Sequence, residues 1–411
     1  MYSSVKALGL VAVVSLSSPI CYANENFNIT IDALGQTVSH GFSFAENTFD
    51  TFDSDQLEMT FAGFDRNVDT AAASLDFRGL NMQLEYPDLG GARLQLRIPS
   101  IGIDEEFIGS TRKESEDMLE DFFKGKSSVV INDILKALAA VSSTDPLAGN
   151  PNSLMSEMIS SDFDIGMMDN QTTNNIKNSE TDAAQDNQIG VGLRIDNMDI
   201  NGREVKSYHL PLSYTIRMDS NPRHQLRISL PLSYTKTDQA EAYKAGLGIA
   251  YSFPVSENWS LTPSLSYGLI GSPDMASAGA VLGMSLTSRY QWDLSEDSSI
   301  VLGNAIGKYE TSSLEYDDYE LNPDIKNTVY TNGLNYSFGM FQFIKTTIFV
   351  TDTVFTGDDL YVEHTDELGV VFSPLSSGSA LLDSHAKIGF SYLTTDADDL
   401  DGFRIRFSSS F

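Results

Sequence analysis

The sequence predicts an all-β transmembrane barrel of about twelve antiparallel strands, preceded by a small N-terminal α+β module. Between about residues 189 and 411, segments of about ten residues alternate apolar and polar side chains, and turns separate them. The polar positions hold mainly Gly, Ser, Thr and Arg, whereas the apolar positions hold mainly Leu, Ile, Tyr and Phe. A soluble β-protein with an apolar core remains the alternative, but this composition favours a barrel with lipid outside and a polar lumen.

The composition limits the classes of partner. The chain has 411 residues, and 57 acidic against 26 basic side chains give a formal net charge of −31. A general nucleic-acid binder needs a basic footprint, so we expect no nucleic-acid partner. With 41% hydrophobic residues the chain is too apolar to be disordered throughout.

Residues 1–23 predict a signal peptide for export. Lys6 supplies a positive charge, residues 7–20 are mostly apolar, and cleavage is expected after Ala23. Lipidation of Cys21 is the alternative, although residues 18–20 match a lipoprotein signal poorly. Cleavage would remove the single Cys, and with it any disulfide or thiolate metal site. No later stretch has the roughly 18 uncharged apolar residues of a transmembrane helix.

The region 24–166 is expected to form the small α+β module, as a passenger or as a plug of the barrel. Alternating runs at Leu57–Phe61, Leu80–Tyr86 and Arg93–Ile98 predict strands. Residues 87–91, which include Pro and two Gly, predict a hairpin connection between the last two runs.

Helices are expected in the second part of this region. Thr111 and Glu114 have the spacing of a capping box, and apolar side chains at helical spacing follow them. A second helical stripe lies within Ile131–Val141, and Ser153–Ser160 predicts a short third helix. The segment 167–188 is rich in Asn, Gln, Thr, Asp and Ser, which predicts a polar linker or a segment threaded through the pore.

The phase of the alternation assigns each side chain to one face of the barrel wall. In residues 208–217, for example, even positions are apolar or aromatic, and odd positions are His, Pro, Ser, Thr and Arg. Arg227 and Arg404 are then expected to face the lumen. Lipid is expected to contact Leu210, Leu230, Ile249 and Ile405.

Counting back from the chain end gives twelve strands, and an even number places both barrel ends on the periplasmic side. The segments 298–309 and 341–374 have mixed phase, so ten strands remain the alternative. The expected strands lie near 189–198, 203–218, 224–235, 243–253, 258–270, 278–292, 298–309, 326–338, 341–353, 366–374, 385–394 and 401–411.

The lengths of the connections predict the orientation. Residues 219–223, 254–257, 293–297 and 339–340 form short connections, which are typical of the periplasmic end. The connections at 310–325 and 354–365 are longer and acidic, which is typical of outer loops. Two connections are exceptions: 375–384 is long at the expected periplasmic end, and 199–202 is short at the outer end. Aromatic residues flank the short turns, where an interfacial belt is expected.

The end of the chain carries a resemblance. The apolar outer face of the last strand, with Phe at the terminus, resembles the signal by which outer-membrane barrels reach their assembly machinery; its residues are Phe403, Ile405, Phe407 and Phe411. A C-terminal translocator of about 220 residues after an exported region resembles the autotransporter β-domain family. The resemblance covers 189–411 and implies a twelve-stranded barrel with the preceding segment running through the pore. Unlike many passengers of that family, residues 24–166 are short and have no solenoid repeat.

This resemblance implies an outer-membrane translocator in bacteria that anchors, and can export, its short N-terminal module. The alternative is a passive, anion-preferring outer-membrane pore with an N-terminal plug. The implied partners are outer-membrane lipid, lipopolysaccharide and the barrel-assembly machinery. The sequence does not predict the oligomeric state.

Catalytic and metal-binding motifs give little support to an enzyme. The chain has five His, without the H-E-x-x-H pattern, and it has neither a G-x-S-x-G elbow nor a P-loop. We therefore expect no cofactor, no metal and no catalytic residue. A third interpretation, an enzyme at the barrel rim, would depend on His209 with Ser207 or Ser213.

Basic side chains on the inner face are the main candidate site. The predicted lumen-lining basic residues are Arg194, Arg217, Arg227, Arg289, Lys387, Arg404 and Arg406. One hypothesis is that the acidic segment 104–121, or the linker after it, occupies this basic lumen. The alternative is that the arginines pair with Asp and Glu of the barrel wall.

Overall fold

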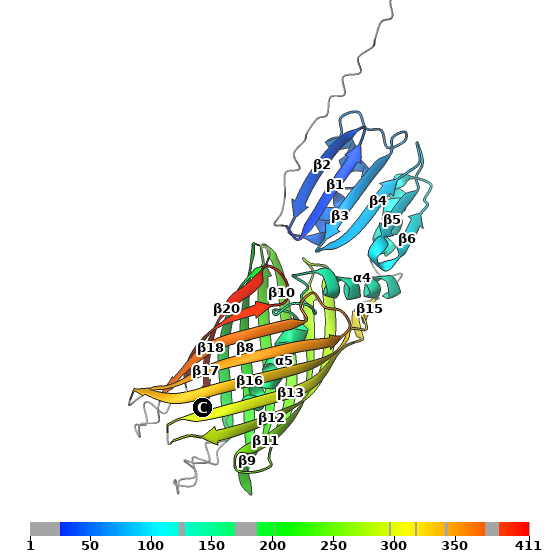
Figure 1. Ribbon diagram of the computed structural model, residues 1–411. Helices are drawn as coiled ribbons and strands as arrows, with labels where there is room; N and C mark the ends of the chain where they lie inside the picture. Colours follow the sequence, from blue (N-terminus) through cyan, green and yellow to red (C-terminus); the bar gives the residue numbers. More distant parts are fainter. Residues whose placement is uncertain are drawn as a thin grey trace, which may run out of the picture.

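A computed structural model describes residues 25–122, 128–168, 187–200, 202–295, 297–316, 319–341, 344–374 and 386–410. These residues form a six-stranded antiparallel sheet with helices, seated at one end of a closed barrel (Figure 1). The predicted signal peptide and most of the predicted linker lie outside the described residues.

The sheet of the N-terminal module has the strand order β2-β1-β3-β4-β5-β6. Its strands are β1 (Phe27–Ala33), β2 (Gln36–Phe42), β3 (Ala71–Phe77), β4 (Leu80–Tyr86), β5 (Leu94–Ile98) and β6 (Ile103–Phe107). Alternate side chains of β1 (Phe27, Ile29 and Ile31) are fully buried. The sheet therefore has one face on a hydrophobic core and one face toward solvent. The strands expected at Leu80–Tyr86 and Arg93–Ile98 correspond to β4 and β5.

Short helices cover the buried face of this sheet. They are α1 (Ala45–Asp50), α2 (Ser54–Thr60), the 3-10 turn η1 (Pro99–Ile101), α3 (Arg112–Asp121) and α4 (Ser128–Val141). The strand predicted at Leu57–Phe61 is wrong, because these residues belong to α2 and its C-terminal end. Leu57 and Phe61 are both buried, and a spacing of four fits one face of a helix as well as a strand.

The predicted cap of α3 is present in altered form. The Thr111 side chain accepts a hydrogen bond from the backbone N–H of Glu114, at 3.2 Å. The Glu114 carboxylate accepts from the backbone N–H of Ser110, at 2.6 Å, instead of from Thr111 as a capping box requires.

A polar cluster joins α2, α3 and β4 beside the core of the module. One oxygen of Glu116 accepts hydrogen bonds from the backbone N–H of Ser54 (2.9 Å) and from the Tyr86 hydroxyl (2.7 Å). Although burial opposes it, hydrogen bonds from Asp53, Ser54 and Tyr86 lower the pKa of Glu116. Burial, together with the hydrogen bond and charge of Glu116, raises the pKa of Asp53 to about 7.

This carboxyl pair predicts that the module loses stability as the pH rises. The pKa of Asp53 is raised on folding, so its stabilising contribution is complete below about pH 4 and is lost as the pH rises through about 7. Asp53 is partly exposed, so we expect an effect on the order of 1 kcal/mol between pH 5 and 8. Asp53→Asn should flatten the profile and stabilise the module at pH 8. Hydrogen exchange of β4 amides, corrected for intrinsic rates, measures this effect. The exposed Asp50→Asn is the control, and an unchanged slope in Asp53→Asn would contradict the prediction.

The barrel consists of twelve antiparallel strands, so the predicted fold class is confirmed and the alternative of ten strands is wrong. The last strand pairs with the first, for example Phe407 with Leu193, and this pairing closes the wall. The barrel strands are β7 (Gln188–Ile200), β8 (Arg203–Met218), β9 (Asn221–Thr237), β10 (Ala240–Pro254), β11 (Trp259–Ser272), β12 (Ser277–Asp293), β13 (Ser299–Ser312), β16 (Lys326–Phe341), β17 (Ile344–Gly357), β18 (His364–Pro374), β19 (Lys387–Thr395) and β20 (Leu400–Ser410). A two-stranded hairpin, β14 (Leu314–Tyr316) with β15 (Tyr319–Leu321), extends one long loop.

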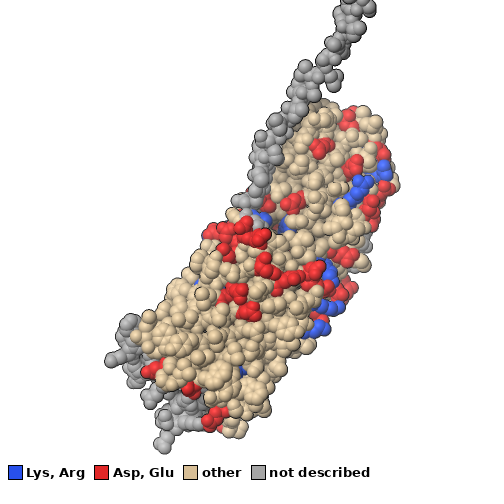
Figure 2. Space-filling view, in the orientation of Figure 1, with Lys and Arg blue, Asp and Glu red and all other residues tan. Residues whose placement is uncertain are grey.

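The apolar side chains of the barrel face outward, as the alternation predicts. Leu210, Leu230 and Ile249 are 39%, 44% and 45% exposed, whereas Arg404 is 3% exposed. The visible outer surface of the barrel is largely uncharged at mid-height, and acidic side chains gather where the module meets the barrel (Figure 2). An apolar exterior around a polar interior is the architecture of a transmembrane barrel and excludes the soluble alternative. No helix in the described part of the chain is long and apolar enough to cross a bilayer.

Candidate functional site: a helix held inside the barrel

The segment 142–153 leads from the module into the mouth of the barrel, and its side chains are buried throughout. Asp145 forms an ion pair with Arg78, which lies in the turn between β3 and β4; their Oδ2 and Nη1 atoms are 3.1 Å apart. The other carboxylate oxygen of Asp145 accepts from the backbone N–H groups of Leu147 (2.9 Å) and Ala148 (3.1 Å). One carboxylate therefore fixes both the local turn and its contact with the module.

The loop between β17 and β18 holds this segment and the C-terminal end of α4 from the barrel side. The backbone N–H of Tyr361 donates to the carbonyl of Ala139 (2.9 Å), and that of Val362 donates to the carbonyl of Gly149 (3.0 Å). Gly149 has φ +90°, and a Cβ atom there would lie 2.1 Å from the Ala139 carbonyl oxygen. Only glycine fits this close approach, so the sequence itself specifies how the mouth is closed.

Helix α5 (Leu154–Met167) lies inside the barrel along β10 to β13. Ser153 caps its N-terminus by accepting from the backbone N–H of Ser156, at 3.4 Å. Its apolar side chains pack on wall positions without side chains: a Cβ atom on Gly268 would lie 2.7 Å from Met158 Sδ. The helix, predicted at Ser153–Ser160, is longer than the sequence stripe indicates.

Two acidic side chains of α5 bind polar groups of the wall. Glu157 forms an ion pair with Lys244 and accepts from the Ser233 hydroxyl at 2.6 Å. Asp162 accepts from the hydroxyls of Ser266 (2.9 Å) and Tyr309 (2.8 Å). Because buried carboxylates are costly unless they are paired, these contacts define one position of the helix in the lumen.

Two predicted lumen arginines bind the C-terminal end of α5. Arg227 donates from Nη1 to the carbonyl of Ile165 (3.1 Å), and Arg289 donates from Nε to the carbonyl of Met167 (3.3 Å). The last carbonyls of a helix have no partner within the helix, and cations there complement its dipole. The wall thus supplies the C-terminal cap of α5.

Three further predicted basic residues form ion pairs with the wall itself. Arg194 lies 3.2 Å from Asp196, and Arg404 reaches both Asp196 (3.4 Å) and Glu367 (2.9 Å). Arg406 lies 2.8 Å from the other oxygen of Glu367. These arginines therefore pair with Asp and Glu of the barrel wall, which is the alternative to the plug hypothesis.

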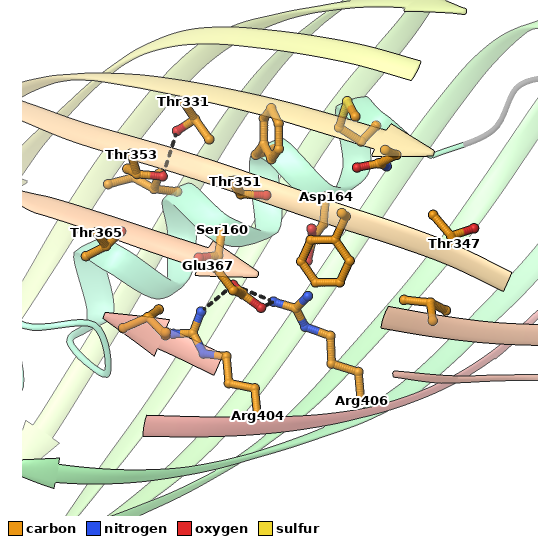
Figure 3. A pocket seen from close by; sticks show the side chains of 17 residues that line it. Ser160, Asp164, Thr331, Thr347, Thr351, Thr353, Thr365, Glu367, Arg404 and Arg406 are labelled. Atoms are coloured by element: carbon orange, nitrogen blue, oxygen red, sulfur yellow. Dashed lines mark hydrogen bonds and ion pairs between the residues drawn. The ribbon is translucent and has the colours of Figure 1, made fainter. Parts of the chain in front are cut away.

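A cavity of about 170 Å³ lies between α5 and this arginine cluster (Figure 3). Ser160 and Asp164 line it from the helix, and Glu367, Arg404 and Arg406 line it from the wall. The lumen beside the helix is therefore polar and charged.

A larger cavity of about 410 Å³ lies between the wall and the C-terminal part of α5, where Glu157, Asp164 and Met167 line it. Its lining includes Arg194, Arg289, Lys345, Lys387 and Arg406. Of the remaining predicted positions, Lys387 thus lines this cavity, and Arg217 is a buried inner-face residue of β8.

The acidic segment 104–121 does not occupy the lumen, so that part of the hypothesis is wrong. Its residues form β6 and α3, which belong to the module. Their acidic side chains make other contacts there: Glu106 pairs with Arg93 at 2.8 Å. The packing of Phe107 and Leu119 in the module core outweighs attraction to the basic lumen.

His209 is part of the wall network and is not paired with the predicted serines. Its Nε2 lies 3.1 Å from Asp196, and its Nδ1 lies 3.0 Å from the Ser233 hydroxyl. Ser207 instead shares a hydrogen bond of 2.9 Å with Thr235. Ser233 directs its proton to Glu157, so these groups hold α5 instead of presenting a free nucleophile.

The predicted assembly signal lies on the last strand. Phe403 and Phe407 of β20 are exposed on the outer face, and Ile405 is half-buried between them. Phe411 lies outside the described residues. The role of these four residues in assembly stays a prediction.

The sequence interpretation missed the partners that hold the helix. Glu157, Asp162 and Lys244 were not singled out, because a charged residue within an apolar stripe also fits an ordinary solvent-exposed helix. A useful signal is the row of glycines on inner-face positions, such as Gly268 and Gly303, where a close approach of another element is possible.

No family model matches the chain, and no curated protein matches it. Among solved structures, the chain is similar to the translocator domain of the autotransporter NalP from Neisseria meningitidis, at 11% identity over 62% of this chain and 95% of that chain, with a TM-score of 0.42. It is similar to the β-domain of the Bordetella autotransporter BrkA, at 10% identity over 55% and 98% of the two chains, with a TM-score of 0.41. It is also similar to the porin NanC, at 11% identity over 54% and 98%, with a TM-score of 0.36.

Proposed function

We propose that this chain is an outer-membrane barrel that anchors its own N-terminal module on the cell surface, and that the module reaches this side through the lumen. The observation that carries the proposal is the path of the described chain inside the closed barrel. The module contacts the barrel end that carries the long connection 313–325, called the long-loop end below. At this end Ala45 donates from its backbone N–H to the carbonyl of Asp274 (3.0 Å). Arg203 donates to the Asn26 side chain at the same end (2.7 Å).

The chain then has to return to the opposite end. Helix α5 starts near Lys244 and Gly268 and ends near Arg289 and Gly303, farther from the module. Strand β7 ends beside the module, because Ile200 pairs with Arg203, which binds Asn26. Its first residues therefore lie at the opposite end of the barrel, where Gly190 pairs with Ser410. A segment inside the lumen therefore connects a module at one end to a barrel that starts at the other.

This path matches a passenger that precedes its translocator. If the long loops face outward, as their lengths favour, the module is on the cell surface and β7 starts on the periplasmic side. A closed barrel has no open edge, so the lumen is the route by which the module reaches this side in our proposal.

We expect impermeant maleimide to label the module on intact cells. A chain with its signal removed has no Cys, so Leu89→Cys, in a module loop where Leu89 is 80% exposed, gives a single probe. Asp398→Cys marks the long-loop end, and Glu257→Cys marks the short-turn end. Labelling at positions 89 and 398 on intact cells, with position 257 labelled only after lysis, is the expected result. Labelling of position 257 alone on intact cells would contradict the proposal.

A second function, an anion-preferring pore closed by α5, is favoured by one observation. Five arginine and lysine side chains line the cavity of about 410 Å³ beside α5, against the two acidic side chains Glu157 and Asp164 of the helix. Such a lining attracts anions once a continuous path exists. This function requires α5 to leave its position, whereas anchoring does not.

A further inference from the structure

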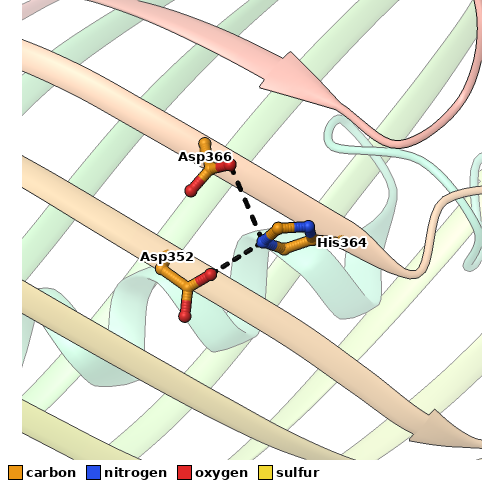
Figure 4. A group of neighbouring side chains, drawn as sticks. All are labelled: Asp352, His364 and Asp366. Carbon is orange, nitrogen blue, oxygen red and sulfur yellow. Dashed lines mark hydrogen bonds and ion pairs between the residues drawn. The ribbon is translucent and has the colours of Figure 1, made fainter.

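Three side chains near the module end of the barrel form a cluster on the outer surface, separate from the lumen. Asp352 belongs to β17, and His364 and Asp366 belong to β18 (Figure 4). Asp352 and Asp366 are directly paired across the two strands. The Nε2 atom of His364 lies 2.7 Å from Asp352 Oδ1 and 3.7 Å from Asp366 Oδ2. The alternation of β18 makes Asp366 face outward, because the next residue, Glu367, lines the lumen.

The cluster lies at the border of the apolar outer surface. The next outward-facing residues toward the middle of the barrel are Val350 and Leu368, which are 42% and 61% exposed. In the other direction, β17 and β18 end in the loop 358–363. Two carboxylates beside an apolar surface repel each other unless a cation lies between them.

A neighbouring amide orients one carboxylate of the cluster. Asn332 of β16 donates to Asp352 Oδ2 at 3.1 Å, and Asn304 of β13 donates to Asn332 Oδ1 at 2.7 Å. These bonds hold Asp352 Oδ2, so Oδ1 is directed toward His364. A ligand carboxylate with its second oxygen held by a neighbour is typical of metal sites.

We propose that Asp352, His364 and Asp366 bind a divalent metal ion with the preferences of Zn²⁺. One imidazole nitrogen and two carboxylate oxygens form a donor set that suits this ion, and three protein ligands leave a fourth position for water. Ligand atoms of a tetrahedral zinc site lie about 3.4 Å apart, given metal–ligand distances of about 2.1 Å. The separations of 2.7 Å and 3.7 Å bracket this value, and all three ligand atoms lie within 4.8 Å of one another.

The metal joins β17 and β18 at the base of the loop that closes the mouth. This loop holds the entering segment through the N–H groups of Tyr361 and Val362, which bind the carbonyls of Ala139 and Gly149. A metal at Asp352, His364 and Asp366 restricts the loop and stabilises the seated position of that segment. The inference does not depend on the proposed function, because it concerns the outer surface and a loop.

The test uses the full chain in detergent, without a histidine tag, titrated with Zn²⁺ alone. We expect one ion bound in a step that His364→Asn, Asp352→Asn and Asp366→Asn each remove. Asn332→Ala should weaken binding by about tenfold, as the loss of a group that orients a ligand does. Co²⁺ provides a second readout, since its visible absorption reports tetrahedral coordination and should disappear in His364→Asn.

His224→Asn is the matched control. His224 also lies on the outer face, at the opposite end of the barrel, where its Nδ1 is 3.0 Å from the Tyr251 hydroxyl. The site is supported if His224→Asn still binds one Zn²⁺ ion. It is also supported if Zn²⁺ slows the hydrogen exchange of residues 358–363 in the unaltered chain. Equal Zn²⁺ binding by the unaltered chain and His364→Asn would overturn it, and would leave a protonated His364 as the cation between the two carboxylates.

Discussion

Removing residues 25–168 is expected to convert the barrel into an open pore, whereas removing residues 25–141 alone is not. The first deletion removes α5, and a helix with its side chains is about 10 Å across. The wall around the emptied space is polar, so water and ions can fill it. The second deletion leaves α5 with its contacts to Lys244, Ser266 and Tyr309.

Planar-bilayer recordings measure this difference. We expect a steady conductance for the barrel without 25–168, and little conductance for the full chain and for the chain without 25–141. The open pore should prefer anions, because Arg227 and Arg289 lose the helix carbonyls that they bind, and the acidic groups of α5 are gone. Equal conductance of the two deletion variants would show that α5 does not close the pore.

A substitution in the full chain separates the role of the helix from the effects of truncation. Glu157→Lys places a cation beside Lys244, His209 and Arg194, and like charges at this distance repel. We expect brief openings in this variant. Glu157→Gln keeps the shape and part of the hydrogen bonding, so it should stay mostly closed. Identical closed behaviour of Glu157→Lys would contradict the assigned position of the helix.

The barrel was predictable because one rule acts at every position. An Arg on the lipid face near the bilayer midplane costs about 2–4 kcal/mol, so the phase of alternation has a single acceptable solution along each strand. Arg404 and Leu210 follow that rule, and each lies on the predicted face. Strand number followed from the same pattern, except where the phase is mixed.

The module was less predictable because its elements are short. The strand expected at Leu57–Phe61 is a helix of seven residues, and a run of that length fits either period. Strands β1, β2, β3 and β6 were not predicted. In β2 no side chain is buried, and β6 carries three acidic residues in a row, so neither shows a clear alternation. Strands β1 and β3 alternate as β4 does and were missed. Tertiary packing, and not local pattern, decides such segments.

The contacts that hold α5 depend on distances that the sequence does not contain. Glu157 and Lys244 are 87 residues apart, and Asp162 and Tyr309 are 147 residues apart. The contact between Asp352 and His364 on the outer surface is also not predictable from the sequence, although the two residues are closer in the chain. Asp352 and His364 lie on different strands, and only the register between β17 and β18 brings them together.

The buried ion pair at the mouth should be the most sensitive point of the junction between module and barrel. Asp145→Ala leaves Arg78 without its partner in a site where both side chains are almost fully buried. Breaking a buried pair in this way costs about 3–5 kcal/mol. The backbone N–H groups of Leu147 and Ala148 lose their acceptor as well. We expect residues 142–153 to become sensitive to protease and fast in hydrogen exchange while the barrel stays folded.

The double variant Arg78→Met, Asp145→Asn tests why Asp145→Ala is destabilising. The cause is either the lost attraction between the two charges or the unpaired charge that stays buried on Arg78. Asp145→Asn keeps an oxygen for the N–H groups of Leu147 and Ala148, and Arg78→Met removes the buried cation. Among the described residues, Nε and Nη2 of Arg78 have no hydrogen-bond partner, so the pair does not fully offset the desolvation of the guanidinium. The combination should therefore restore most of the protection that Asp145→Ala loses. If instead the double variant is as labile as Asp145→Ala, the attraction between the two charges is itself what seats the segment, and the mouth is held by electrostatics more than by packing.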